Sequence, residues 1–236
     1  MAKSNRYLKN SKVSNAKFRH VLRLFSLDIE ATKISELTNL NRNTINRLLR
    51  IIRSKMADEC KRRAKLNGVV EADESFFGPR RVKGMRGRGA GSKTIVFGLF
   101  KRGGDVYTEI VSNCSKATLQ AIVRGKVDVD SVINTDKWRG YDGLVDVGYR
   151  KHVRVDHLRG EFVRGHAHIN GIEGFWSFAR HWLYMYRGMP EKTAHLYLGE
   201  VSYRFNHRAE PLFPLVHGLL RRLTPDKIKK IFVQAR

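Results

Sequence analysis

The chain has 236 residues, with 46 Lys and Arg against 22 Asp and Glu, which gives a formal net charge of +24. Apolar residues make up 42% of the chain, enough to bury a hydrophobic core, so a wholly disordered protein is disfavoured. A charge this large favours a polyanionic partner, and nucleic acid is the most common one. Composition alone therefore predicts a folded protein that binds nucleic acid.

The sequence carries no sign of a membrane or secreted protein. It has no run of about 18 apolar residues, the length that spans a bilayer. Its basic N-terminus lacks the apolar segment of a secretory signal. Cys60 and Cys114 are the two cysteines, too few for a disulfide scaffold or a four-cysteine zinc module. We expect a cytoplasmic, nucleoid-associated protein with no membrane partner.

Residues 1–66 predict a small helical domain that binds DNA. They hold 17 Lys and Arg against 5 Asp and Glu, a net charge of +12. Apolar residues recur there at helical spacing in three groups: Phe18, Val21, Leu22 and Phe25; Ile34, Leu37 and Leu40; and Ile45, Leu48, Leu49 and Ile52. Between the last two groups lies the polar turn TNLNRNT, where Asn41 or Asn43 could cap the next helix. This pattern is typical of a helix-turn-helix, although an ordinary solvated helical hairpin also has it.

Two sets of basic and polar residues are candidates for DNA contacts. The second helix of a helix-turn-helix lies in the major groove. Here it would present Arg42, Asn43, Asn46 and Arg50. Residues 80–93 hold six positive charges, four glycines and no acid, which predicts a loop that contacts the DNA backbone. The positive residues of that loop are Arg80, Arg81, Lys83, Arg86, Arg88 and Lys93.

From residue 67 the apolar pattern changes to that of strands. Strands are predicted at 68–78, at 93–113 as a pair that turns at Gly103 and Gly104, at 129–138 and at 149–157. Helices are predicted at 115–127, at 169–186 and within 190–236. This order predicts an α/β fold with a mixed sheet and helices, preceded by the small all-α domain.

Two aspartates in these strands indicate a site. Strand alternation places Glu71, Asp73 and Ser75 on one face of the first strand. Burying an acid there is costly unless it is paired or bound to a metal. Asp136 ends the apolar strand VINTD, where a side chain emerges at the carboxyl edge of the sheet. One such Asp is usually a turn former, but two in a chain with few acids are harder to explain that way.

The predicted helix at 169–186 carries two parallel stripes. The apolar stripe, which we expect to be buried, consists of Ile169, Ile172, Trp176, Ala179, Leu183 and Tyr186. The polar stripe beside it consists of Asn170, Glu173, Ser177 and Arg180. Glu173 and Arg180 share a face and lie about 10 Å apart along the axis. The polar stripe could be only the solvated flank of an amphipathic helix, but Glu173 is the one acid on it.

Asp73, Asp136 and Glu173 together predict a two-metal site for phosphoryl transfer. Mg²⁺ prefers a few hard oxygen ligands, because it keeps waters and also takes substrate phosphate oxygens. Two ions roughly 4 Å apart would activate a water or a 3′-hydroxyl and stabilise the leaving oxygen. We expect Mg²⁺ or Mn²⁺ as the cofactor. A zinc site at His157, His166 and His168 is disfavoured, since no cysteine or fourth ligand completes it.

Four motifs carry a resemblance to a known family. They are VEADESFFG, VINTDKWRGY, HAHINGIEGFWSFARHWL and YRFNHR, in this order. Over about residues 69–208 the chain resembles the ISXO2-like insertion-sequence transposases related to Merlin elements. The resemblance implies a DDE-type enzyme with an RNase H-like catalytic core. It also implies that Asp73 and Asp136 are the two catalytic aspartates and that Glu173 is the third acid.

The chain departs from that family pattern in three ways. Family members typically carry Lys or another basic residue seven positions after the third acid, and Arg180 stands there, with a different geometry from Lys. Some relatives use Asn as the third ligand, which leaves Asn170 as an alternative to Glu173. Many relatives begin with a zinc ribbon, for which this chain lacks the cysteines, so its helical N-terminus is the expected DNA reader.

Together these features predict a transposase with three parts. Residues 1–66 would read DNA, residues 67–210 would form the catalytic domain, and residues 211–236 would be a basic helical tail. The protein would bind the terminal inverted repeats of its element as a homo-oligomer on double-stranded DNA, and would cleave strands and join them to target DNA. The alternatives are a non-catalytic helix-turn-helix regulator and a nuclease that cuts without joining.

Overall fold

The computed structural model describes residues 12–63, 65–78, 93–136, 148–149, 151–155, 168–186 and 191–221. The chain divides into two compact units. The first unit consists of residues 1–59 together with residues 207–236, and the second consists of residues 60–206. Among the helices in the described residues, none is both long and apolar enough to cross a membrane.

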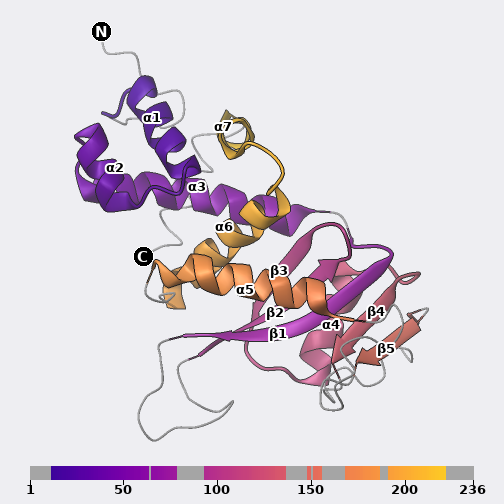
Figure 1. Ribbon diagram of the computed structural model, residues 1–236. Coiled ribbons are helices and arrows are strands. Elements are labelled where there is room, and N and C mark those ends of the chain that lie inside the picture. Colours follow the sequence, from indigo (N-terminus) through magenta and orange to yellow (C-terminus); the bar gives the residue numbers. More distant parts are fainter. Residues whose placement is uncertain are drawn as a thin grey trace, which may run out of the picture. The chain divides into compact units, whose positions relative to one another are not determined.

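The first unit is helical (Figure 1). It contains α1 (Asn15–Ser26), α2 (Ala31–Thr38), most of α3 (Arg42–Arg62) and α7 (Leu212–Arg221). Ser14 caps α1, since its side chain accepts a hydrogen bond from the Lys17 N–H at 3.2 Å. Asn39 ends α2 in the left-handed conformation, with φ of 50°. Asn41 Oδ1 then accepts from the Asn43 N–H at 2.8 Å, so of the two predicted caps Asn41 is the one used.

The apolar groups found in the sequence form the core of this unit, except that Leu40 is half-buried and Leu37 is exposed. Phe18, Ile34 and Ile45, from three successive helices, are each fully buried. Leu37 of the second group is 53% exposed, although the helix that its spacing predicts is present. The reason is the short length of α2, whose buried side is the line from Ile34 to Thr38, and Leu37 lies about a quarter turn away from that line.

Helix α7 packs against α1 within the helical unit. Val216 and Leu220 of α7 are buried. The Arg23 guanidinium of α1 lies over the Phe213 ring, 5.2 Å from its centre. The helix predicted near the C-terminus is therefore present at Leu212–Arg221 and is part of a packed unit. The rest of the predicted tail lies outside the described residues.

The second unit is built on a five-stranded sheet with the order β3-β2-β1-β4-β5. The strands are β1 (Val69–Phe77), β2 (Thr94–Lys101), β3 (Val106–Val111), β4 (Val132–Asp136) and β5 (Lys151–Val155). Pairing is antiparallel between β1 and β2 and between β2 and β3, and parallel between β1 and β4 and between β4 and β5. This confirms the predicted mixed α/β fold and every strand predicted from the sequence.

Helices cover both faces of this sheet (Figure 1). On one face α4 (Lys116–Lys126) packs Leu119 and Val123 against Val70 and Ala72 of β1. On the other face lie α5 (Asn170–Tyr184) and α6 (Ala194–Asn206), with the short 3₁₀ helix η4 (Glu191–Thr193) before α6. The predicted apolar stripe of α5 forms the core of this second face.

Glycine at position 98 allows the close approach of α5 to the sheet. A Cβ atom on Gly98 of β2 would lie 2.5 Å from the ring of Trp176 and 2.9 Å from the side chain of Ile172. Any side chain at this position would push α5 away from β2, since protein interiors have few voids to absorb it. The helix is therefore seated directly on the backbone of the sheet at this point.

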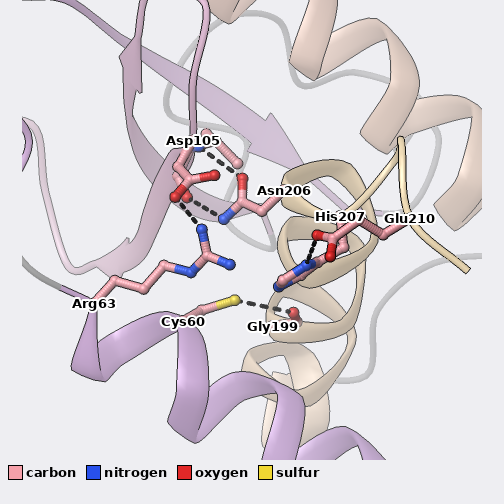
Figure 2. A network of polar contacts seen from close by, with 8 residues as sticks. Cys60, Arg63, Asp105, Gly199, Asn206, His207 and Glu210 are labelled. Carbon is pink, nitrogen blue, oxygen red and sulfur yellow. Dashed lines mark hydrogen bonds and ion pairs between the residues drawn. The ribbon is translucent and has the colours of Figure 1, made fainter. Parts of the chain in front are cut away.

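Polar contacts fix the ends of α3 and α6 to the edge strand of the second unit (Figure 2). The Asn206 side chain makes two hydrogen bonds with the backbone of Val106. Its Oδ1 accepts from the Val106 N–H at 2.7 Å, and its Nδ2 donates to the Val106 carbonyl at 2.9 Å. Arg63 forms an ion pair with Asp105, and Cys60 lies 3.8 Å from the Gly199 carbonyl. Asn206 belongs to the YRFNHR motif, so this residue of the motif has a structural contact.

Candidate active site

Strand β1 and helix α5 face each other through three successive polar contacts. Alternate residues of a strand are about 6.7 Å apart, and residues four apart on a helix are about 6 Å apart, so the two elements stay matched over three positions. The contacts are the Ile172 N–H to Glu71 at 3.0 Å, Trp176 Nε1 to Asp73 at 3.1 Å, and Arg180 to the Ser75 hydroxyl at 2.7 Å. The predicted shared face of Glu71, Asp73 and Ser75 is the face covered by α5.

The structure brings Asp73 and Asp136 together. Ala72 of β1 pairs with Thr135 of β4 in parallel register, so the two aspartates occupy the next position of neighbouring strands. Burial raises the pKa of Asp73 to about 7, and the charges of Glu74 and Asp136 add to the effect. The hydrogen bond from Trp176 partly opposes it. The site thus concentrates negative charge where water is scarce, which a cation would offset.

Glu173 and Arg180 lie on one flank of α5. Phe175 and Phe178 lie on the other, where both pack on Phe205 of α6 with ring centres 5.1 and 5.6 Å apart. At about 3.6 residues per turn, Glu173 is roughly 160° around the helix from Phe175. Because α6 is bonded to β3 and α5 lies over β1, the flank with Glu173 faces the β4 side of the sheet.

Glu173, the predicted third ligand, does not form a close three-carboxylate cluster with Asp73 and Asp136. Among the described residues, no three His, Cys, Asp or Glu side chains are near enough together to hold a metal ion. Glu173 is exposed in the first turn of α5, and Asn170, which begins the helix, is exposed as well. The geometry therefore pairs Asp73 with Asp136 and leaves the choice between Glu173 and Asn170 to experiment.

The aspartate pair fits the chemistry of a Mg²⁺ or Mn²⁺ site. Its donors are hard carboxylate oxygens on neighbouring strands, the ligand type that these ions prefer. Burial and the neighbouring charges of Glu74 and Asp136 raise the pKa of Asp73, and a bound cation would favour its ionised form. Arg180 is held beside the pair by its hydrogen bond to Ser75, two residues after Asp73.

Sequence analysis missed the role of two residues in this region. Trp176 was predicted only as a core residue, although its indole also donates to Asp73. Glu71 was placed on the correct face but given no function. Its side chain is fully buried and is bonded to α5 and to Arg102. The signal that could have found them is the matching spacing of 71, 73 and 75 on the strand with 172, 176 and 180 on the helix.

The candidate DNA-reading residues lie on α3 of the helical unit. Arg42, Asn43 and Asn46 are exposed and Arg50 is half-buried, while Ile45 between them is buried. The first turns of α3 thus present a polar face to solvent, as a recognition helix requires.

Several predicted residues lie outside the described part of the chain. Of the basic loop, Lys93 is exposed just before β2. The other loop residues, Arg80, Arg81, Lys83, Arg86 and Arg88, lie outside the described residues, as do His157 and His166.

The sequence is similar to transposase-related proteins. The profile of the ISXO2-like transposase domain matches residues 65–206. An uncharacterized transposase-like protein of Haemophilus influenzae is 42% identical over 102 residues, which are 43% of this chain and 81% of that protein. An uncharacterized protein in transposable element ISH50 of Halobacterium salinarum is 29% identical over 151 residues, which are 58% of this chain and 51% of that protein. The chain thus spans about half the length of the second relative.

Solved structures of Mos1 transposase are more distant. The pre-cleavage Mos1 transpososome is 15% identical, with a TM-score of 0.36, and the match covers 95% of this chain and 79% of that one. The mariner Mos1 paired end complex with Mg is 14% identical, with a TM-score of 0.37, and the match covers 97% and 81%. At these scores the matches add nothing to the fold described above. The family profile covers more than half of the chain, including both aspartates and all of α5, and the chain therefore belongs to the family of ISXO2-like transposase domains.

Proposed function

We propose that this protein is a DDE-type transposase that cleaves DNA at the terminal inverted repeats of its insertion sequence and joins the freed 3′ end to target DNA. The observation that carries the proposal is the placement of Asp73 and Asp136 at adjacent positions of parallel strands. Two adjacent, half-buried carboxylates repel each other unless a cation is bound, so the pair points to a metal-dependent reaction. Membership of a transposase family supports DNA as the substrate.

Each residue of the site has a proposed part in the reaction. Asp73 and Asp136 would hold Mg²⁺ or Mn²⁺, and Glu173 is the proposed third ligand because its flank of α5 faces β4. When bound, the metal would activate a water or 3′-hydroxyl and stabilise the oxygen that leaves phosphorus. Arg180, fixed by Ser75, would place positive charge beside the DNA phosphate. The displacement needs no covalent intermediate with the protein, so no Ser or Tyr nucleophile is required.

The helical unit would supply recognition of the element ends. Arg42, Asn46 and Arg50 of α3 would read bases, and the basic residues at 80–93 would contact phosphates of any sequence. An element has two ends, and a homo-oligomer would hold both at once. The net charge of +24 favours association with DNA in general.

A strand-transfer assay tests this proposal. The full chain is incubated with labelled DNA that carries the element ends and with unlabelled target DNA, in Mg²⁺, in Mn²⁺ and in EDTA. We expect nicked and joined products with either metal and none in EDTA. A non-catalytic regulator would bind the ends equally well in all three conditions and never cut them. A simple nuclease would release cut ends without joining them.

A further inference from the structure

Glu71 is the centre of a buried network of hydrogen bonds. Glu71 is not one of the predicted metal ligands, and it is not an apolar core residue. Its side chain is 0% exposed. One carboxylate oxygen accepts from Nε and Nη2 of Arg102, each at 3.1 Å, and the other accepts from the Ile172 N–H at 3.0 Å. His168 Nδ1 lies 3.4 Å from the first oxygen. A carboxylate so deeply buried is retained only when its oxygens are satisfied in this way.

The network caps α5 from a distance. Ile169, at the N-cap position, makes no side-chain capping bond. A helix N-terminus needs acceptors for its free N–H groups and is stabilised by negative charge. Glu71 supplies both from β1, a strand 101 residues earlier in the chain. Gly171 makes the contact possible, since a Cβ there would lie 2.8 Å from a Glu71 oxygen and closer still to the Phe100 ring.

The same network also reaches β4. Arg102 Nη2 donates to the His168 carbonyl at 3.0 Å, and Asn134 Nδ2 donates to the same carbonyl at 3.2 Å. Asn134 is the parallel-register partner of Glu71. The segment that enters α5 is therefore tied to both parallel strands at one level of the sheet.

The network joins β1, β4 and α5, the three elements that carry the predicted ligands. On each element the bonded residue lies one or two positions before the ligand. Glu71 precedes Asp73 by two residues on β1, and Asn134 precedes Asp136 by two on β4. On α5, the bonded N–H of Ile172 is one residue before Glu173. Movement at this level of the sheet would shift all three ligands relative to one another, and metal sites tolerate little such movement.

We infer that Glu71 is a positioning residue, which fixes the start of α5 to β1 and β4 and thereby sets the separation of Glu173 from the two aspartates. The inference rests on the proposed function, since it assigns Glu71 a part in the same metal site. This role differs from packing, because replacing Glu71 should weaken metal binding more than an equal loss of stability elsewhere in the unit would.

The second unit contains a matched control. Glu200 of α6 is also 0% exposed and bonded to an arginine, Arg204, at 2.9 and 3.0 Å. Both residues of that pair lie on α6, and Arg204 contacts α5 through the Trp182 ring in its last turn, 5.6 Å away. E200Q therefore removes a buried charge of the same kind far from the start of α5, where Glu71 is bonded. Arg102 offers a milder change to the Glu71 network, because its side chain is 29% exposed.

The test measures Mn²⁺ affinity and thermal midpoint on the full chain for E71Q, R102Q, E200Q and D136N, with free Mn²⁺ followed by electron paramagnetic resonance. We expect E71Q to weaken Mn²⁺ binding by about 10- to 100-fold, the usual effect of losing a residue that orients metal ligands. R102Q should weaken it in the same direction, and it decides the question if E71Q does not fold. E200Q should leave the affinity within about twofold of wild type at a comparable loss of midpoint.

Two results would overturn the inference while leaving the proposed function in place. One is wild-type Mn²⁺ affinity in R102Q and in folded E71Q, and the other is an equal loss of affinity in E200Q. If D136N binds Mn²⁺ as wild type does, the proposed metal site itself is wrong and the positioning role falls with it. D136N thus separates failure of the site from failure of the inference about Glu71.

Discussion

The indole nitrogen of Trp176 donates a hydrogen bond to Oδ2 of Asp73 at 3.1 Å, so a core residue of α5 orients a predicted metal ligand on β1. The ring reaches this position because Gly98 on the neighbouring strand has no side chain to block it. Packing of the second core and geometry of the site are therefore linked. A change in α5 that leaves the fold intact can still disturb Asp73.

The first prediction concerns this bond. W176F keeps an aromatic ring but removes the donor that lowers the pKa of Asp73, so that pKa should rise further. We expect strand joining at pH 7 to fall by about tenfold or more, with a smaller deficit at higher pH. W182F is the control, since its buried indole nitrogen has no hydrogen-bond partner in the described structure. Equal losses in both variants would mean that only packing is affected.

The second prediction concerns the aspartate pair. D136N should abolish cleavage and joining while leaving binding to element ends nearly unchanged, because it removes a metal ligand and no phosphate contact. D73N should behave in the same way. Band shifts with end DNA and strand-transfer products are measured on the same preparations. Joining above about a hundredth of wild type in either variant would argue against the assignment.

The third prediction separates Glu173 from Asn170. Both start α5 on its exposed side, but a carboxylate brings a full charge to a hard cation and an amide does not. E173Q should therefore cost several orders of magnitude in joining, whereas N170A should cost about tenfold. Activity of both variants is compared in Mg²⁺ and in Mn²⁺. An active E173Q beside an inactive N170A would make Asn170 the third ligand.

The fourth prediction concerns DNA reading by α3. Replacing Arg42, Asn46 and Arg50 with Ala should reduce the preference for element ends over random DNA. Changes of Arg and Lys at 80–93 should instead weaken binding to all sequences and flatten its salt dependence. Lys116 and Arg124, exposed on α4 of the other unit, provide a control of similar charge. Unchanged preference in the α3 variant would show that specificity lies elsewhere.

The fifth prediction concerns stability and pH without divalent cations. Asp73 has a pKa of about 7 when folded and about 3.9 when unfolded, so the folded state binds its proton more tightly. Its contribution to stability is therefore complete at low pH and is lost as pH rises toward 7. D73N removes this dependence, so the melting temperature of D73N minus that of wild type in EDTA should increase between pH 5 and pH 8.

The increase should be about 5–10 °C, since these two pKa values change the contribution of Asp73 by about 2–3 kcal/mol between pH 5 and pH 8. About 1 kcal/mol shifts the midpoint of a protein this long by about 2–4 °C. Thermal melts at matched ionic strength measure it. Adding Mg²⁺ at pH 8 should raise the midpoint of wild type and not that of D73N. A difference between the two proteins that stays constant with pH would show that Asp73 does not titrate in this range.

The sequence by itself determined the elements and singled out the candidate residues of the site. Local periods of apolar residues are enough to define a helix or a strand, because each period reflects the geometry of that element alone. The strands, the long α5 and the three-helix start were all found in this way. The acids were conspicuous for the same reason, since Asp73 and Asp136 interrupt apolar strands and Glu173 is the one acid on its helix.

Only the tertiary structure decided which of these residues act together. The parallel pairing that sets Asp73 beside Asp136 joins segments more than 60 residues apart. The bonds from α5 to Glu71 and Asp73 span 101 and 103 residues. No local period encodes such contacts, and the packing of α7 on α1 is hidden for the same reason. Glu71 shows the limit most clearly: its sequence position indicates a buried acid, but its partners are fixed by the way the sheet and helix come together.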